Sequence, residues 1–387
     1  MTARRNLTVL LSGMVAANPH YGGASWAVLQ YVLGLKRLGH EVYVVEPVTA
    51  RSLQPEGAPL ARSVNARYFH RVMEDFGLEG ASALLLEGAK ETVGASYDEL
   101  RTLTRRADVL VNINGILAER ELVKGIPVRI YLDIDPGFNQ LWHATQGIDR
   151  RFAGHTHHVT IGHGIGAPWC SVPTCGIDWL KSMQPVVLEY WPVQTEIRHD
   201  ALTTVANWRA DGSFEHNGVF YGQKAHSLRR LIALPTRTSE RFLLALAIHG
   251  DEEKDLDALI RNRWRLVDPA KVAATPADYR RFIQGSKAEF GLAKHGYAAA
   301  ACGWFSDRSV CYMASGRPVV AQETGFSRLL PTGEGLFAFE TVEDALEAIE
   351  ELNRDYPRHA RAARAIAEEH FDSDKVLSRL LAQVGIG

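Results

Sequence analysis

The chain has 387 residues, of which 46% are hydrophobic and 23% charged, and its formal net charge is −2. This length exceeds one typical hydrophobic core and predicts a globular protein of two domains. The near-neutral charge argues against a nucleic acid polymer as a partner. No stretch approaches the ~20 apolar residues of a membrane span, so no integral membrane contact is expected.

The first residues and the cysteines bear on the cellular location of the protein. A short apolar run, Leu7 to Leu11, follows two arginines and passes into a loop, which predicts a buried strand rather than a signal peptide. The cysteines at positions 170, 175, 302 and 311 form no CxxC pair, so neither a zinc site nor a redox pair is indicated. A reducing cytoplasm is the simplest location for such a chain.

The chain opens with a strand, a loop, a helix and a second strand, at 7–11, 12–23, 24–38 and 42–45. This order is typical of a parallel α/β sheet. Gly22 and Gly23 stand at the start of the helix, where glycines let a ligand approach backbone N–H groups. The loop lacks a GxGxxG dinucleotide fingerprint, and a tight turn explains the two glycines as well.

Further strands are expected at 84–87, 108–113 and 128–132, with helices at 64–76 and 97–105. The strand at 128–132 is followed by Asp133-Ile134-Asp135. Ligands of open α/β sheets bind beyond the carboxyl ends of the strands, so either carboxylate is a candidate to accept a proton from an acceptor hydroxyl. The alternative is that both aspartates begin a turn.

Four histidines, His155, His157, His158 and His163, gather around the next strand-like segment. On a strand, an i, i+2 spacing only places two of them on one face. No acidic or cysteine ligand lies nearby at a helpful spacing, so we expect no metal site here.

After a strand at 185–191, the polar segment 192–200 is typical of an interdomain linker, and the α/β rhythm then restarts. Strands are expected at 201–208, 242–248, 265–267, 288–292 and 319–321. Helices are expected at 225–233, 256–263, 278–284, 342–353, 358–370 and 374–384.

Residues 302–326 carry the clearest binding signal of the second half. Ser306 is a good N-cap with Asp307 at the first helical position, and Gly316 suits the left-handed residue that ends a helix. A helix N-terminus docked on a sheet offers backbone N–H groups and a positive dipole end to a phosphate. Side-chain donors would come from Ser306, Arg308 and Ser309, although these residues equally suit the cap of a surface helix.

Two segments resemble a known family. Gly22-Gly23-Ala24 followed by LGLKRLGHEVYVV resembles the opening of GT-B glycosyltransferases, and YMASGRPVV at 312–320 resembles their C-terminal AMASGxPVV segment. The resemblance implies an α/β fold of two Rossmann-like domains that face a cleft. It divides the chain into an acceptor domain at 1–192, a nucleotide-sugar donor domain at 193–372, and a C-terminal helix at 373–387 that packs back on the first domain.

In that family the second domain holds most of the nucleotide-sugar donor. The resemblance implies that the helix beginning at Ser306 faces the diphosphate, and that Arg209 or Lys224 supplies a further basic group. It also implies that Gly22 and Gly23 touch the donor from across the cleft. Backbone atoms near Val267 would meet the base.

The chain departs from the family pattern at two glutamate positions, which here are Gly303 and Cys311. Asp307 and Glu323 are the candidate substitutes for holding sugar or ribose hydroxyls. Because of this departure, both a retaining and an inverting reaction stay open. In an inverting reaction, Asp133 or Asp135 would be the base.

We therefore expect a glycosyltransferase that moves a sugar from a nucleotide-diphosphate sugar to a hydroxyl of a small, soluble acceptor. No cofactor is expected, because the helix N-terminus, Arg308 and Lys224 would stabilise the leaving diphosphate without a metal. Three alternatives stay open: a sugar-nucleotide epimerase of the same fold, a non-catalytic nucleotide-sugar-binding protein, and a GT-A enzyme with Asp133-Ile134-Asp135 as a metal-binding DxD motif.

Overall fold

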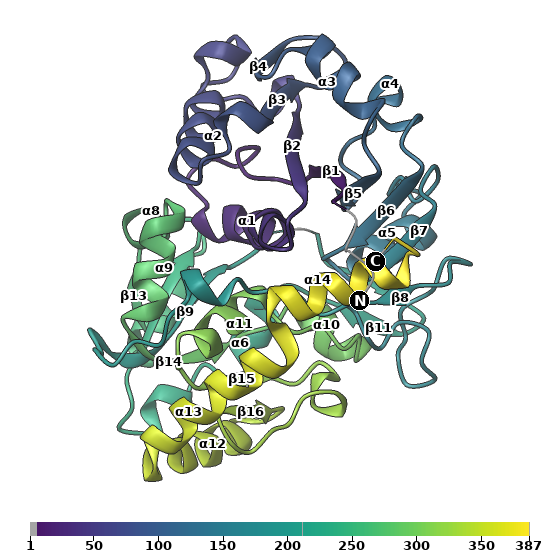
Figure 1. Ribbon diagram of the computed structural model, residues 1–387. Helices are drawn as coiled ribbons and strands as arrows, with labels where there is room; N and C mark the ends of the chain where they lie inside the picture. Colours follow the sequence, from purple (N-terminus) through teal and green to yellow (C-terminus); the bar gives the residue numbers. More distant parts are fainter. Residues whose placement is uncertain (1–5, 211, 387) are drawn as a thin grey trace.

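The computed structural model describes residues 6–210 and 212–386. They form two large β-sheets, each with its own helices, and a short β-hairpin. We refer to the first sheet with its helices as the first domain and to the second as the second domain; the boundaries drawn from the sequence stay a prediction. In Figure 1 the first domain lies above the second, and the yellow C-terminal helices return from the second toward the first. No helix of the described residues is long and apolar enough to cross a membrane.

The first sheet has the strand order β4-β3-β2-β1-β5-β6-β7-β8, and all pairs are parallel except β3 with β4. The strands are β1 (Thr8–Ser12), β2 (Glu41–Val48), β3 (Ser82–Leu86), β4 (Thr92–Gly94), β5 (Val109–Ile113), β6 (Val128–Asp133), β7 (His157–Thr160) and β8 (Leu180–Lys181). The helices are α1 (Gly22–Arg37), α2 (Val64–Asp75), α3 (Tyr97–Thr104), α4 (Arg120–Val123) and α5 (Phe138–Thr145).

Both faces of this sheet are covered, as is usual for parallel strands. Leu10 of β1 belongs to the apolar cluster that includes α3 and α4, whereas its neighbours Val9 and Leu11 belong to the cluster that includes α1 and α2. Because successive side chains of a strand point to opposite faces, the continuous apolar run of β1 is explained by its central place in the sheet.

The second sheet is parallel throughout, in the order β13-β12-β9-β14-β15-β16. Its strands are β9 (His199–Asn207), β12 (Phe242–Ala247), β13 (Arg265–Val267), β14 (Ser286–Gly291), β15 (Val319–Gln322) and β16 (Leu336–Phe339). Its helices are α6 (Lys224–Arg230), α7 (Glu253–Arg261), α8 (Pro269–Val272), α9 (Pro276–Gln284), α10 (His295–Ala300), α11 (Asp307–Ala314), α12 (Val342–Arg354), α13 (Tyr356–Ile366) and α14 (Ser373–Gln383).

Short helical turns join several of these elements. They are η1 (Ala50–Ser52), η2 (Leu60–Arg62), η3 (Glu79–Ala81), η4 (Leu188–Tyr190), η5 (Leu234–Thr236), η6 (Phe326–Arg328) and the π-helical η7 (Ala367–Phe371). An antiparallel hairpin of β10 (Phe214–His216) and β11 (Val219–Tyr221) interrupts the chain between β9 and α6. Its turn, Asn217-Gly218, has positive φ at both residues, which is the pattern of a two-residue hairpin turn.

The strand expected at 185–191 is wrong. Val186 instead exchanges backbone hydrogen bonds with the segment that links η7 to α14, and η4 follows directly. Three side chains are fully buried where these two segments meet: Val186, Val187 and Trp191. A short apolar run looks the same whether it joins a sheet or packs between domains, which explains the error.

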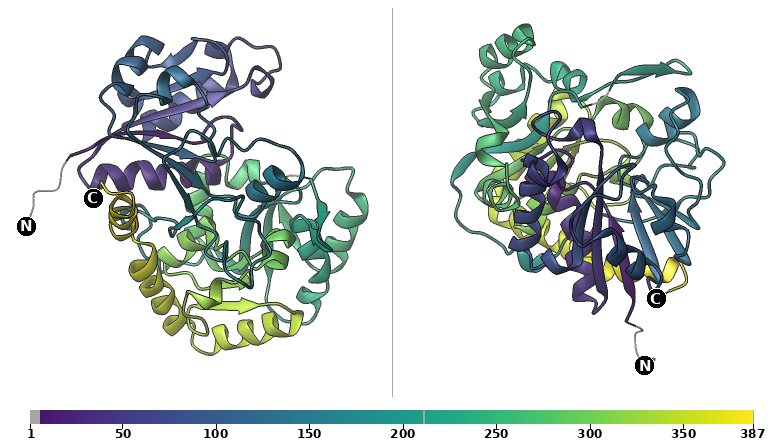
Figure 2. Two further views of the ribbon diagram at one scale, coloured as in Figure 1. Left: turned by 90° about the vertical axis from the view of Figure 1, so that its right-hand side faces the viewer. Right: turned by 90° about the horizontal axis from the view of Figure 1, so that it is seen from above.

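Helix α1 lies between the two sheets, with α14 beside it, as the left view of Figure 2 shows. A Cβ built on Gly34 of α1 would lie 2.5 Å from Leu377 Cδ1 and 2.9 Å from Ser373 Cβ. Arg37 extends this contact with hydrogen bonds to Asp374 and Glu189. The C-terminal helix therefore packs on the first domain at a position where any larger residue would force the side chains of Leu377 and Ser373 to shift.

Replacing Gly34 by valine should lower the free energy of unfolding by about 1–3 kcal/mol, because the side chain overpacks the contact with α14. Chemical denaturation measures the change. Gly80→Val is the matched control, since a Cβ there meets nothing within 4 Å, and should change stability by less than about 0.5 kcal/mol. Equal effects of both substitutions would contradict this account of the α1–α14 contact.

Candidate functional site

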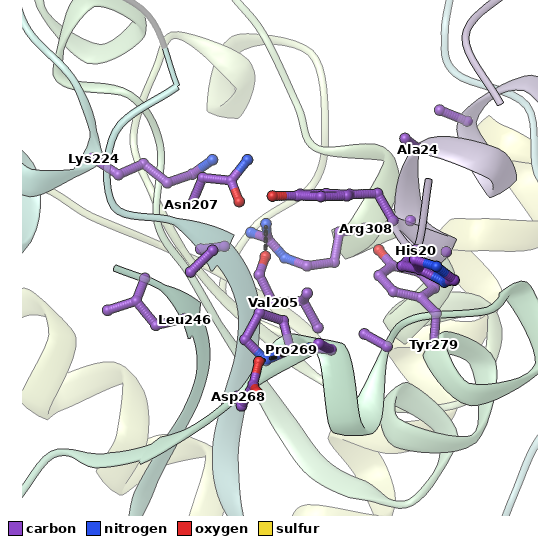
Figure 3. A pocket seen from close by; sticks show the side chains of 18 of the residues that line it. His20, Ala24, Val205, Asn207, Lys224, Leu246, Asp268, Pro269, Tyr279 and Arg308 are labelled. Atoms are coloured by element: carbon purple, nitrogen blue, oxygen red, sulfur yellow. Dashed lines mark hydrogen bonds between the residues drawn. The ribbon is translucent and has the colours of Figure 1, made fainter. Parts of the chain in front are cut away.

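A cavity of about 580 Å³ opens between the start of α1 and the carboxyl ends of β9 and β12. We call it the interdomain cavity, because the first domain contributes His20 to Ala24 and Ala27 while the second contributes the other walls. Figure 3 shows His20 and Ala24 on one side, with Lys224 and Asn207 across from them. The volume suits a drug-sized or nucleotide-sized ligand.

Arg308, the second residue of α11, is held rigidly in the wall of this cavity. Its Nε donates to Glu289 Oε1 at 2.6 Å and its Nη1 to the Val205 carbonyl at 2.9 Å. Burial by itself lowers the pKa of Arg308, but the Glu289 carboxylate outweighs it and raises the pKa above its ordinary value. Nη2 is buried and has no hydrogen-bond partner among the described residues. The guanidinium is thus charged, and the donor capacity of Nη2 is unused.

Lys224 opens α6 and points into the same cavity beside Asn207 (Figure 3). Its ammonium makes no hydrogen bond or ion pair with any residue that the structure describes. Burial, and then the charges of Arg308 and Lys294, lower its pKa to about 7. A bound anion would relieve this penalty, because an opposite charge nearby favours the protonated amine.

Asp307, the first residue of α11, is a carboxylate of this wall. Burial raises its pKa, and the charges of Arg308 and Lys224 act in the opposite direction. Two cations, Lys224 and Arg308, and two carboxylates, Asp307 and Asp268, therefore line the cavity together. Lys224, which has no ion pair among the described residues, is the group placed to receive an anionic ligand, and Asp307 is placed to accept hydrogen bonds from the hydroxyl groups of that ligand.

Gly22 and Gly23 are required by the approach of the second domain. A Cβ on Gly22 would lie 2.2 Å from the Thr275 carbonyl oxygen, and one on Gly23 would lie 2.8 Å from the Tyr279 ring. The Gly22 N–H donates to the Ala273 carbonyl at 3.0 Å. Both glycines also line the cavity, so their lack of side chains brings the two walls together and leaves space for a ligand.

Part of the cavity wall is apolar. Leu246, Ala247 and Ile248 follow or end β12, and Pro269 begins α8. Asp268 caps α8 by accepting a hydrogen bond from the Ala270 N–H. A flat heterocycle fits such a wall, whereas phosphates fit the cationic part.

The structure brings five of the residues predicted to bind the donor to this cavity: Gly22, Gly23, Lys224, Asp307 and Arg308. The others lie elsewhere. Arg209 pairs with Glu252 on the surface, and Val267 lies on the edge strand β13, where it pairs with Ala245 of β12. Ser306 caps α11 and is buried, as is Ser309. A direct role of these four in donor binding stays a prediction.

Asp133 and Asp135 do not line the cavity among the described residues. Asp133 is fully buried and accepts hydrogen bonds of 2.7 Å each from Asn139, Gln140 and Thr160. Asp135 bridges the domains through Lys294, at 3.1 Å, and Tyr297. A hydroxyl could reach Asp133 only after that network opened, so catalysis by either aspartate stays a prediction that this conformation does not favour.

Sequence reasoning missed several residues of the cavity, above all His20, Tyr21, Asn207 and Tyr279. His20 and Tyr21 directly precede the glycines, and Asn207 ends β9, so the rule that ligands bind at carboxyl ends of strands would have found them. Tyr279 reaches the cavity from the middle of α9, and no local pattern marks it.

The histidines at 155–163 have structural partners. His155 lies 3.0 Å from Asn112 Nδ2, and His163 lies 3.1 Å from the Ser182 carbonyl. Among residues 6–210 and 212–386, no three His, Cys, Asp or Glu side chains converge as a metal site requires.

A family model described as glycosyl transferase-like matches residues 228–382. No curated protein matches the chain significantly. The match covers α11 and the strands on either side of it, and it confirms the predicted resemblance to nucleotide-sugar glycosyltransferases. The correspondence of 312–320 to the AMASGxPVV segment is not tested separately and stays a prediction.

Solved structures match almost the whole chain. HepE from Anabaena in complex with UDP-glucose has a TM-score of 0.62 and 14% identity, over 98% of this chain and 100% of that chain. An alpha-glucosyltransferase in complex with UDP-glucose and DNA containing an abasic site has a TM-score of 0.60 and 12% identity, over 98% and 100%. Sucrose-phosphate synthase from Thermosynechococcus elongatus has a TM-score of 0.55 and 13% identity, over 98% and 99%.

At these identities the likeness establishes the fold. The chain has the GT-B fold, as the sequence predicted, and the GT-A alternative is wrong. The family model and these structures together support a glycosyltransferase.

Lys224 should couple the binding of a nucleoside diphosphate to proton uptake. Its pKa of about 7 in the free protein rises when phosphate charge arrives, so affinity should fall as the pH increases from about 7 to about 9, by at most about tenfold per pH unit. Titration calorimetry in two buffers of different ionisation enthalpy measures the number of protons taken up when the ligand binds. Lys224→Met should remove both effects, and an unchanged pH slope in that variant would contradict the assignment.

Arg308→Lys should weaken binding of a nucleoside diphosphate about 10- to 100-fold, because lysine cannot keep the Glu289 and Val205 contacts and still present a donor to the ligand. Binding of the nucleoside without phosphates should be unchanged. Titration calorimetry by competition compares the two ligands. Arg328→Lys, at a cation that faces Trp169 outside the cavity, is the control. An equal loss of affinity for the nucleoside and for the nucleoside diphosphate would show instead that the substitution disturbs the whole cavity.

Proposed function

We propose that this protein transfers a glycosyl group from a nucleotide-diphosphate sugar to a hydroxyl of a small acceptor, without a metal ion. The observation that carries the proposal is that two cations line one cavity: Lys224, which has no ion pair among the described residues, and Arg308, whose Nη2 has no hydrogen-bond partner among them. They lie in or next to a glycosyl transferase-like domain on a GT-B fold.

The apolar and the cationic parts of the cavity wall suggest how the donor lies. The nucleoside would rest on the apolar part at Leu246 and Pro269, and the diphosphate would reach Arg308 and Lys224. Asp307 beside them would accept hydrogen bonds from sugar or ribose hydroxyls. In this orientation the sugar points toward His20 and Gly22 on the first domain.

The reaction that this placement supports is attack of an acceptor hydroxyl on the anomeric carbon, with loss of the nucleoside diphosphate. Negative charge grows on the leaving phosphate as the bond breaks. Cations that are already fixed in a partly desolvated wall stabilise that charge without reorganising. Arg308 meets this condition because Glu289 and Val205 hold it in place before any ligand arrives.

The acceptor would enter from the first domain. His20 places an imidazole on that wall. The residue is exposed, and its ring packs edge-on against the Tyr68 ring with 5.3 Å between the ring centroids. For an inverting reaction it is a better placed base than Asp135, whose carboxylate is engaged by Lys294 and Tyr297. The sequence-based assignment of Asp133 or Asp135 as the base is thereby kept only as the second candidate.

UDP-sugars are the first donors to test, since HepE and the alpha-glucosyltransferase were crystallised with UDP-glucose. The latter complex also contains DNA. A small acceptor is proposed here because the chain carries a net charge of −2, which does not favour a nucleic acid polymer.

The test is a transfer assay with UDP-sugars and a panel of small hydroxyl acceptors, in the presence of excess chelator. We expect release of UDP that depends on acceptor and persists with chelator. Lys224→Ala should lower kcat about 10²–10³-fold by removing one stabilising cation. Lys254→Ala, at an exposed position on α7, is the control and should not change the rate.

Other outcomes would identify the alternatives. A rearranged or hydrolysed sugar formed from the donor alone would indicate an epimerase. Tight donor binding without turnover across the panel would indicate a non-catalytic binding protein. Activity that vanishes with chelator would overturn metal independence.

A further inference from the structure

A second cavity, of about 550 Å³, lies within the first domain and shares no lining residue with the interdomain cavity. Its walls come from α4, the start of β6, the loop 115–118 and the segment 149–155. In Figure 1, α4, β6 and β7 lie on the right of the molecule, whereas α8 and α9, which border the interdomain cavity, lie on the left. We call this cavity the basic groove.

Four permanent cations face the basic groove: Arg120, Lys124, Arg129 and Arg151. They come from three separate segments, so their convergence is a property of the fold rather than of one basic stretch. Asp149 is the carboxylate among the lining residues, and it accepts a hydrogen bond from the Arg151 N–H. In a chain with a net charge of −2, this is a strong local excess of positive charge.

Carboxylates neutralise little of this charge. Arg151 pairs with Glu87 at 2.8 Å, but Arg120 and Lys124 form no side-chain hydrogen bond or ion pair with the described residues. Two glutamates flank Arg120. Glu121 lies 3.6 Å from Lys90 and 3.7 Å from Arg101, and Glu119 accepts a hydrogen bond from the Glu121 N–H.

Arg129 is also without a carboxylate among the described residues, yet it is held in place. Its Nε donates to the Gly154 carbonyl at 2.7 Å and its Nη1 to the Ile126 carbonyl at 2.6 Å. Carbonyls orient the guanidinium and leave its full charge in the groove. His155 lies beside it, and burial lowers the pKa of His155, so this ring adds no charge at neutral pH.

We propose that the basic groove is a second ligand site, for a small molecule that carries phosphate groups. Clefts lined by charges of one sign concentrate the potential and raise the local concentration of anions. Guanidinium groups that are already oriented match the planar pairs of oxygens on a phosphate, and Lys124 adds a mobile charge. This site does not depend on the proposed transferase activity, because it shares no residue with the interdomain cavity.

A nucleic acid is the competing occupant, since a solved structure of this fold contains DNA. The groove does not favour it. A duplex needs a row of cations along an extended face, whereas these four converge on one hollow with α4 and the segment 149–155 as its walls.

The experiment measures binding of inorganic tripolyphosphate to the full chain by calorimetry, with the interdomain cavity filled by excess UDP. We expect the double variant Arg120→Ser, Lys124→Ser to raise Kd at least tenfold. The matched control is Lys254→Ser with Arg265→Ser, which also removes two exposed cations, both without side-chain partners among the described residues. It should change Kd less than twofold. All variants should unfold at the same temperature without ligand, because the changed side chains are exposed.

Three results would overturn the proposal. Equal weakening by both double variants would show an effect of net charge alone. Loss of tripolyphosphate binding by the wild type when UDP is added would place the anion in the interdomain cavity. Tighter binding of a DNA duplex than of tripolyphosphate, lost in the Arg120, Lys124 variant, would assign the groove to nucleic acid. If UDP itself does not bind, the donor site has failed, and the same titration with the two double variants still tests the groove.

Discussion

The buried ion pair between Arg308 and Glu289 is the contact on which the candidate site depends. Glu289 is fully buried on β14, and Arg308 lies in the first turn of α11, so only the packing of this helix on the sheet brings the two side chains to 2.6 Å. A buried pair of this kind rarely adds stability over apolar residues, because both charges lose their water. Its unpaired nitrogen and oxygen make it still less favourable. A role of the guanidinium in ligand binding accounts for this pair better than a role in stability does.

The interdomain cavity has two walls because the helices at the interface approach very closely. Gly22 and Gly23 let α1 meet Thr275 and Tyr279, and Gly34 lets the same helix meet α14. The sequence left two explanations of the paired glycines open, a tight turn and the approach of a ligand. In the structure both glycines belong to the first turn of α1, where they allow close packing on the second domain and also leave room for a ligand. One property, the missing Cβ, serves both, since the walls must be near each other before a small molecule can touch both.

The two cavities hold cations in different physical states. Burial lowers the pKa of Lys224 to about 7, so its charge depends on the ligand that arrives. Arg120 and Lys124 of the basic groove are exposed, keep their charge in water, and act through the field that they create together. The first arrangement suits charge that develops during a reaction, and the second suits attraction of an anion that is already charged.

Local patterns in the sequence determined the α/β class, most strands, and α11 with its Ser306 cap and its left-handed Gly316, because capping and apolar periodicity act over a few residues. The Asn217-Gly218 hairpin was equally local and was overlooked, whereas the run at 185–191 was misread as a strand because packing between domains leaves the same apolar pattern. Only the tertiary structure decided that Arg308 meets Glu289, that Asp133 is sealed in a polar network, and that cations from three segments share a groove. Such contacts join residues far apart in the chain, and no local spacing records the distance between them.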